Sequence, residues 1–296
     1  MFDLTYAPGG MPPADPKRAG QWKTIPGPYP YRAFQPVDLQ DVTLSYTAEL
    51  AALIGNARAV LSALSTRYAL LTKKKQEHFQ QLMVQAEAAA SLKLAGAEDS
   101  KADAYWLEQA VPYSFGELKE LPLSRRLLEE IHDMALHDRT HYRQNPGEFR
   151  RSPVWLGKEG ATLTEGAAFV PPAPEDMAQA FSALEHYMNE EETTEPLVKA
   201  ALVHYQFEMI HPFLDGNGRV GRILALLCLK EAGILPAPIL PLSVQLLNRS
   251  YYYFAYLLAV ENTGAYEVWV RYFIEAILNA AHMAEDEIER DSLQDI

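Results

Sequence analysis

The sequence predicts an all-α fold, a helical bundle that carries one β hairpin. Apolar residues recur at three-to-four spacing along most of the chain, as Leu50, Leu53 and Ile54 illustrate. Prolines and acids stand where helices would begin, and glycines stand where they would end. Only residues 150–172 combine short apolar runs with a glycine-rich turn, which is typical of paired strands.

The first part of the chain divides into an arm and a helical region. Residues 1–37 are rich in proline and glycine (APGGMPPADP, IPGPYPY), so we expect an extended arm that lies on the surface or is partly disordered. From about Asp38 the pattern turns helical, and residues 38–120 form a helical region. The helices expected from the patterns lie, in chain order, near residues 50–64, 76–95, 103–118, 123–136, 174 onward, 196 onward, 219–232, 246–260 and 266–287.

Local signals support several of these boundaries. Gly96 is a plausible residue to end the second helix, because glycine tolerates the left-handed conformation that follows many helices. Pro174 and Pro196 each suit the first position of a helix. Between these helices, the runs 153–156 and 167–170 flank a glycine-rich turn. A lone hairpin is only marginally stable, so we expect it to lie on the helical body, where such hairpins often serve as binding edges.

Composition narrows the function classes. The formal net charge of −13 argues against a nucleic-acid partner, although one basic pocket remains compatible with it. The single cysteine, Cys228, stands in an apolar helical run and is expected to pack rather than react. The N-terminus lacks a signal-peptide pattern, and no apolar run approaches membrane length. We therefore expect a cytoplasmic protein with no membrane association.

The stretch HPFLDGNGRVGR at residues 211–222 carries the chemistry. His211 can accept a proton from a hydroxyl group, and Asp215 offers oxygen ligands that suit Mg²⁺. The glycines at 216 and 218 let the backbone approach a ligand, and a helix N-terminus binds anions. Arg219 and Arg222 lie on one helix face and suit phosphate oxygens. A lone histidine, a lone turn or two surface arginines would each be ordinary, but twelve residues combine all of them.

This stretch matches the signature of the Fic family, H-P-F-x-(D/E)-G-N-G-R-x-x-R, at every defining position. The segments AALVHYQFEMI, GEFRRSPVWLG and NRSYYYFAYLLAV also resemble the family, and the resemblance covers roughly residues 123–276. It implies a Fic-type fold in which residues 121–296 form the catalytic core, with a flap hairpin at 150–172.

The resemblance also implies an activity and a set of roles. Fic proteins of this type are protein adenylyltransferases, which transfer AMP from ATP to a Ser, Thr or Tyr hydroxyl of a target protein. His211 would be the general base and Asp215 would hold Mg²⁺, while Phe213 would be buried and anchor the loop. The phosphates would be held by Gly216, Asn217, Gly218, Arg219 and Arg222. The flap at about 151–170 would pair with the target protein.

Two further parts of the resemblance are looser. Tyr252, Tyr253 and Asn262 match positions of an adenine pocket, but aromatic core packing explains the two tyrosines equally well. EAAASLKLAG at 87–96 resembles an inhibitory helix with the pattern (S/T)-x-x-x-E-(G/N), in which the glutamate pairs with the second motif arginine. Here Ala95 stands at the glutamate position, whether naturally or by an introduced change.

Several alternatives stay open at this point. The inhibitory contact between this segment and Arg222 is absent, or Glu98 supplies the missing carboxylate. A third reading is that the segment is an alanine-rich core helix whose match is accidental. The protein as a whole is an active enzyme, an enzyme that transfers another phosphate-containing group, or a silent module that holds a protein strand. A homodimer is a common default assembly and stays a candidate.

Overall fold

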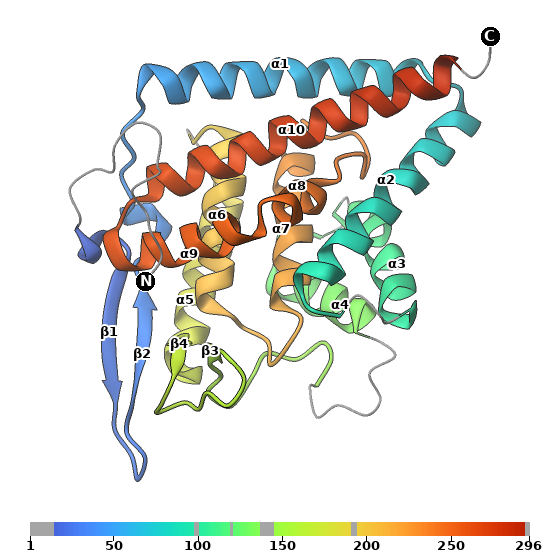
Figure 1. The fold of residues 1–296 in the computed structure, drawn as a ribbon. Coiled ribbons are helices and arrows are strands. Elements are labelled where there is room, and N and C mark those ends of the chain that lie inside the picture. Colours follow the sequence, from blue (N-terminus) through green and yellow to red (C-terminus); the bar gives the residue numbers. More distant parts are fainter. Residues whose placement is uncertain (1–14, 98–100, 119–120, 137–144, 191–193, 294–296) are drawn as a thin grey trace.

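The computed structural model describes residues 15–97, 101–118, 121–136, 145–190 and 194–293. Within these ranges the chain is mainly helical, with two short antiparallel hairpins (Figure 1). The helices are α1 Ala48–Leu70, α2 Lys73–Leu94, α3 Lys101–Glu117, α4 Arg125–Ala135, α5 Pro174–Asn189, α6 Pro196–Ile210, α7 Asn217–Glu231, α8 Leu242–Asn248, α9 Ser250–Thr263 and α10 Tyr266–Leu293. The predicted all-α fold is confirmed.

Helix α6 forms the centre of the bundle. It is apolar on nearly every side, and all but two of its residues are buried. A helix with this pattern must be enclosed by other elements. Helix α7 packs along it, with α5 and α10 against other faces, while α1 lies along α10 at the edge of the bundle (Figure 1). No helix among the described residues is both long and apolar enough to cross a bilayer.

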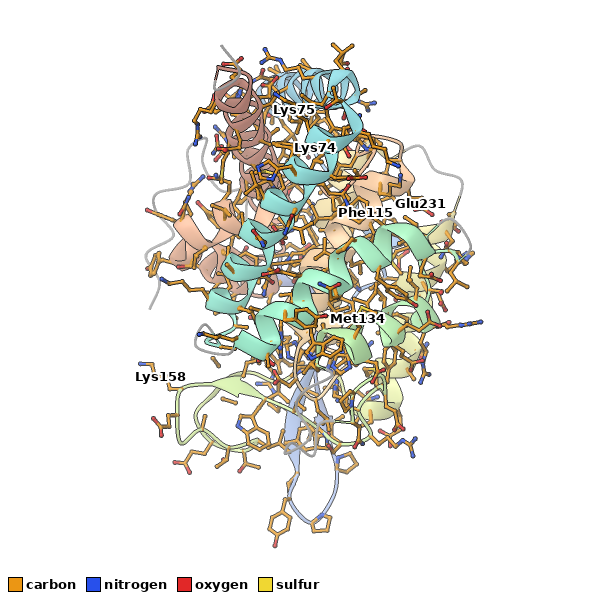
Figure 2. All side chains as sticks on the ribbon, turned by 90° about the vertical axis from the view of Figure 1, so that its right-hand side faces the viewer. Lys74, Lys75, Phe115, Met134, Lys158 and Glu231 are labelled. Atoms are coloured by element: carbon orange, nitrogen blue, oxygen red, sulfur yellow. The ribbon has the colours of Figure 1, made fainter. Side chains whose placement is uncertain are left out.

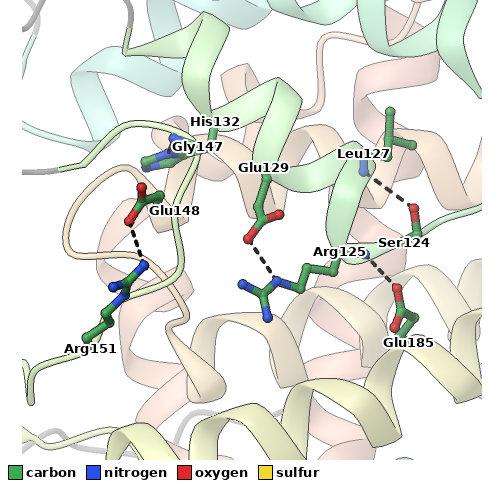
Figure 3. A network of polar contacts seen from close by, with 9 residues as sticks. All are labelled: Ser124, Arg125, Leu127, Glu129, His132, Gly147, Glu148, Arg151 and Glu185. Carbon is green, nitrogen blue, oxygen red and sulfur yellow. Dashed lines mark hydrogen bonds and ion pairs between the residues drawn. The ribbon is translucent and has the colours of Figure 1, made fainter.

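Helix starts follow the local signals in the sequence. Pro174 and Pro196 occupy the first positions of α5 and α6, as predicted. The carboxylate of Glu195 accepts hydrogen bonds from the first free amides of α6. The hydroxyl of Ser124 caps α4 by accepting from the amide of Leu127 at 3.4 Å (Figure 3). These caps satisfy amides that have no partner within the helix.

One predicted helix is divided in two. The pattern near residues 246–260 predicts one element, but the structure breaks it at Arg249, between α8 and α9. The backbone of Arg249 is non-helical, and its carbonyl accepts a hydrogen bond from the Tyr272 hydroxyl at 3.3 Å. Its guanidinium lies over the rings of Tyr252 and Tyr272 and pairs with Glu275. Contacts with α10 therefore stabilise a break that local periodicity does not reveal.

The N-terminal region holds a second hairpin. The sequence predicts an extended arm at 1–37, and residues 1–14 of it lie outside the described residues. Strands β1 (Gly20–Ile25) and β2 (Tyr31–Pro36) pair antiparallel, with Trp22 opposite Phe34. The structure thus differs from the predicted arm at residues 20–36, because these two aromatic side chains have a buried surface on which to pack.

The two hairpins are joined. The predicted flap contains β3 (Leu156–Gly157) paired with β4 (Ala167–Phe169). The Phe34 amide donates to the Val170 carbonyl at 2.8 Å, and the rings of Trp22, Phe34 and Phe169 pack together. Both hairpins project from the same end of the molecule (Figures 1 and 2). This end also carries the loop between α6 and α7.

Candidate functional site

His211 ends α6 in a left-handed conformation, with φ of 50°. Its amide donates to the Phe207 carbonyl at 2.9 Å, which completes the helix. Its ring nitrogen Nδ1 lies 3.2 Å from the Glu208 carbonyl. Because a carbonyl can only accept, Nδ1 carries the proton and Nε2 keeps a free lone pair. Burial lowers the pKa of His211 to about 4, with a smaller lowering effect from the charge of Arg150 and opposing effects from the Glu208 carbonyl and Asp215. The ring is therefore neutral at pH 7.

The loop after His211 is closed by one side chain. The Asn217 amide group accepts from the Phe213 amide at 2.8 Å and donates to the Phe213 carbonyl at 2.9 Å. Phe213 is fully buried, as predicted. The family resemblance assigns the Asn217 side chain to a phosphate cradle, but here that side chain holds the loop. The cradle would then rest on backbone groups.

Gly216 makes the sharp turn into α7. Its φ is 77°, a conformation that costs other residues energy. A Cβ at this position would also lie 2.7 Å from the side chain of Leu136. The next residue begins α7, and among the described residues no side chain caps its first amides. Uncapped amides and the helix dipole make this end of α7 a candidate anion site.

The His132 side chain packs against the loop between α6 and α7. Its ring stacks on Phe213, with ring centroids 3.8 Å apart and 3° between the ring planes. Nδ1 accepts from the Gly147 amide at 2.8 Å, so the proton sits on Nε2, which donates to the Asp215 carbonyl at 3.0 Å. Burial lowers the pKa of His132 to about 4. A neutral histidine thus fixes the backbone at the candidate metal ligand.

Asp215 is the candidate magnesium ligand. One carboxylate oxygen accepts from the Gly216 amide at 2.7 Å, the other lies 3.4 Å from Arg219, and the side chain is 38% exposed. Among the described residues there is no cluster of three or more His, Cys, Asp or Glu side chains that would enclose a metal. One exposed carboxylate nevertheless fits Mg²⁺, which keeps several waters and shares phosphate oxygens.

The two motif arginines are buried. Arg219 is 1% exposed and lies between Asp215 and Asp103 of α3. Arg222 is 2% exposed, and its Nη1 atom lies 2.9 Å from the place that a Cβ on Gly218 would occupy. It therefore faces the first turn of α7. Both arginines are fixed close to the anion site rather than free on the surface.

Arg222 is held by helix α2. Its Nε donates to the Ser91 hydroxyl at 2.9 Å and its Nη2 donates to the Ser91 carbonyl at 2.7 Å. Ala95 follows the last residue of α2, one turn after Ser91, and is exposed. Gly96 has φ of 66°, as expected for the residue that ends this helix. The inhibitory-helix-like segment thus contacts the predicted arginine, while Glu98 lies outside the described residues.

Buried groups behind the motif hold α6 and α7 together. Gly221 of α7 lies so close to Glu208 that a Cβ there would overlap the carboxyl group. Burial raises the pKa of Glu208 to about 7, against a smaller opposing effect of Arg222. His204 donates from Nδ1 to the Gly221 carbonyl at 2.8 Å, and its Nε2 accepts from the Tyr253 hydroxyl. Tyr253 is therefore a core residue.

The other adenine-pocket candidates lie differently. Tyr252 is 38% exposed on α9 and stacks with Tyr256. Asn262 donates to the Leu258 carbonyl of its own helix at 2.6 Å and to the adjacent Glu261. These contacts leave the Tyr252 ring accessible to a ligand and hold the Asn262 side chain against α9.

Three residues with contacts at the site escape the sequence patterns. They are His132, Arg150 and Glu208. Arg150 and Glu208 stand inside segments that resemble the family, so a signal existed for them, while Ser91 occupies the first position of the inhibitory-helix pattern. His132 carries no such signal, and only the fold distinguishes Arg150 from the adjacent arginine.

Part of the chain is similar to known proteins. Residues 122–229 match the model of the Fic/DOC family. The chain is 36% identical over 147 residues to the protein adenylyltransferase Fic of Drosophila grimshawi, and 35% identical over 147 residues to the one of Drosophila melanogaster. The match to the first covers 48% of this chain and 27% of that protein, and the match to the second covers 48% and 26%. The chain thus spans about a quarter of these relatives.

Solved structures share the fold. A Fic family protein from Desulfovibrio desulfuricans G20 has a TM-score of 0.64 at 18% identity, over 82% of this chain and 76% of that chain. A fragment of Fic-1 from C. elegans has a TM-score of 0.56 at 18% identity, over 82% of this chain and 75% of that chain. The likeness therefore extends well beyond residues 122–229 and includes most of the helical body.

Proposed function

We propose that the protein is a protein adenylyltransferase, on the basis that residues 122–229 match the Fic/DOC family. It transfers AMP from ATP to a Ser, Thr or Tyr hydroxyl of a target protein and of itself. One observation carries the proposal: a neutral imidazole with a free Nε2 stands a few residues from an uncapped helix N-terminus with two buried arginines.

The residues of the site support the following transfer step. The hydroxyl proton passes to Nε2 of His211, and the hydroxyl oxygen forms a bond to the α-phosphorus of ATP. The bond from that phosphorus to the bridging oxygen of the β-phosphate breaks, and pyrophosphate leaves with the electron pair. His211 then releases the proton to solvent. Because the pKa of His211 is about 4, its ring stays in the accepting form across neutral pH.

The backbone after Asp215 supplies the phosphate site. The amides at the start of α7 donate to phosphate oxygens, and Arg219 and Arg222 neutralise their charge. Asp215 would hold Mg²⁺, which supplies further neutralisation of the phosphates when bound. The Asn217 side chain keeps these amides in place through Phe213. Positioning and charge neutralisation are the main requirements of such a reaction.

The flap is the proposed docking edge for the target. Trp155 and Leu156 are 42% and 40% exposed at β3. An extended segment can add to an exposed strand through backbone hydrogen bonds, and the exposed apolar side chains then favour particular neighbours. The flap lies at the same end of the molecule as the α6–α7 loop, so a docked segment would present its hydroxyl toward His211.

We also propose that the chain lacks the full inhibitory restraint. Ser91 of α2 contacts Arg222, but Ala95 provides no carboxylate one turn further along. Arg222 is thus held by neutral groups, which compete with a phosphate less strongly than a carboxylate would. ATP can then displace Ser91 and bind productively.

The experiment uses Mg²⁺ and α-labelled ATP with the full chain. The wild-type protein is expected to label itself, with AMP found on Ser, Thr or Tyr by mass spectrometry. His211→Ala should lower the labelling rate by about 10²- to 10⁴-fold, the usual contribution of a general base, while ATP affinity and thermal unfolding stay near wild type. Equal labelling by this variant would remove His211 from the role of base.

A silent interaction module is the alternative from another class. It predicts that neither the wild-type protein nor His211→Ala is labelled, whereas an extended peptide still binds to the flap. γ-Labelled ATP in a parallel reaction identifies transfer of the terminal phosphate instead. The complete set of motif residues, all held in ordered positions, favours adenylyl transfer over both alternatives.

A further inference from the structure

Arg150 lies at the base of the flap and reaches the end of α6. Its side chain is 3% exposed. Nε donates to the His211 carbonyl at 2.7 Å, and Nη2 donates to the Ile210 carbonyl at 3.3 Å. The Arg150 amide donates to the Pro212 carbonyl at 2.8 Å. One residue thus binds the backbone immediately before, at and after the candidate base, where helix carbonyls have no partner of their own.

The same side chain also binds both ends of the flap. Nη1 donates to the Ser152 carbonyl at 3.2 Å, and Nη2 donates to the Pro172 carbonyl at 2.6 Å. Ser152 precedes β3 and Pro172 follows β4, so these two contacts close the base of the hairpin. The planar guanidinium group (the fork) donates hydrogen bonds to several acceptors in fixed directions, whereas a lysine ammonium group does not.

The charge of Arg150 is unusual in this position. Burial lowers its pKa to about 10, so it remains positive at neutral pH. Among the described residues no carboxylate forms an ion pair with Arg150, and its guanidinium donates hydrogen bonds to backbone carbonyls. A buried charge is costly, and an apolar side chain would stabilise a fold at least as well. The residue therefore calls for an explanation beyond packing.

We propose that Arg150 is a positioning residue for adenylyl transfer, which fixes the left-handed turn at His211 and ties it to both ends of the flap. The docking edge and the general base then move as one unit, so a target segment bound at the flap is aligned with the base. This inference rests on the proposed function. It adds a residue that lies outside the 211–222 motif.

An electrostatic effect accompanies the geometry. The charges that act on the His211 ring are Arg150, which lowers its pKa, and Asp215, which raises it. Removing the positive charge should therefore raise the pKa of His211 above about 4. The rate of a reaction that needs the neutral ring would then fall at a higher pH on the acid side.

Three variants separate geometry from charge. Arg150→Gln removes the charge and most of the fork, and Arg150→Lys keeps the charge but loses the fork. Arg126→Gln is the control, because Arg126 lies on α4 outside the flap and the motif, its side chain is 74% exposed, and it pairs with Glu130 at 2.9 Å. Each variant is compared with wild type in self-labelling with Mg²⁺ and α-labelled ATP, over a range of ATP concentrations and pH.

The expected results differ among the variants. Arg150→Gln should lower the maximal rate by about 10- to 100-fold, as expected for a displaced reacting group, with the half-saturating ATP concentration unchanged within about twofold. Its acid limb should move to higher pH. Arg150→Lys should show a similar loss of maximal rate with the wild-type acid limb. Arg126→Gln should match wild type in all three measurements.

A second readout is independent of catalysis. Histidine ¹⁵N spectra report which ring nitrogen of His211 carries the proton, and a titration reports its pKa. Arg150→Gln should lose the uniform Nδ1-protonated form and raise the pKa. Wild-type rates, acid limb and spectra in Arg150→Gln would overturn the proposal, as would an equal loss in Arg126→Gln. If Arg150→Gln does not fold, Arg150→Lys decides by the same rates and spectra. If wild-type protein transfers no AMP, the proposed function fails, while the spectra still decide the role of Arg150.

Discussion

Replacing Ala95 with glutamate tests how Arg222 is controlled. Ala95 follows α2 and lies four residues, about one turn, after Ser91, which binds Arg222 through its hydroxyl and its carbonyl. A glutamate at 95 therefore starts from the same helix face that already contacts the guanidinium. Because Ala95 is exposed, the longer side chain has room to turn toward Arg222.

The size of the effect follows from these contacts. Nη1 of Arg222 faces the first turn of α7, where the phosphates are proposed to bind. A carboxylate on the guanidinium contributes about 1.5–3 kcal/mol as a hydrogen bond to a charged group. A negative charge at the C-terminal end of a helix costs about 0.3–1 kcal/mol. The difference is roughly 1–2 kcal/mol, which weakens ATP binding by about 5- to 30-fold.

The measurements are ATP affinity by calorimetry and self-labelling at limiting ATP. Ala95→Gln is the matched control, because it has nearly the same size and no charge, and it should remain close to wild type. If Ala95→Glu binds ATP and labels itself as wild type does, α2 does not control Arg222 in the way proposed. A loss of equal size in Ala95→Gln would assign the effect to bulk instead of charge.

Three further predictions concern stability, each measured by chemical denaturation. Gly221→Ala should destabilise by about 1–3 kcal/mol, because its Cβ overlaps Glu208; Gly55→Ala in α1, where a Cβ meets nothing within 4 Å, should instead stabilise by about 0.5–1 kcal/mol. Phe213→Ala should cost about 3–5 kcal/mol, because the ring is fully buried against His132, and a cost below about 1 kcal/mol would contradict its role as anchor. The pKa of Glu208 is raised from 4.5 to about 7 in the folded protein. The contribution of its neutral carboxyl group to the free energy of unfolding is therefore present below pH 4.5 and lost as pH rises through 7. Glu208→Gln should therefore equal wild type near pH 4 and exceed it by about 3 kcal/mol at pH 8, and an advantage that does not grow with pH would refute this.

The sequence predicts those features that local chemistry determines. Pro174 and Pro196 start their helices because proline suits the first helical position, and Gly96 ends α2 because it adopts the left-handed conformation. The 211–222 stretch is recognisable because its turn, anion site and arginines follow from adjacent residues. The burial of Phe213 follows from the same resemblance and is confirmed.

Features that depend on distant contacts are not predictable in this way. The break at Arg249 is stabilised from α10, and the β1–β2 hairpin depends on packing between Trp22 and the flap residue Phe169. The resemblance assigns the Asn217 side chain to phosphate, but the loop uses it for its own backbone. Nothing in the local sequence separates Arg150, which is buried at the site, from Arg151, which is exposed.

Under the proposed function, the arrangement of the arginines explains how an acidic protein would hold a triphosphate. The net charge is −13, yet Arg150, Arg219 and Arg222 are each at most 3% exposed at one end of the molecule. Charges fixed in a poorly hydrated site act more strongly than surface charges, and they need no reorganisation during reaction. Because Arg222 is already bound by Ser91, ATP binding exchanges one partner for another instead of ordering a free side chain. Under the proposed function, the affinity for ATP would therefore be set by the difference between these two interactions, and a single residue of α2 would adjust it without changing the motif.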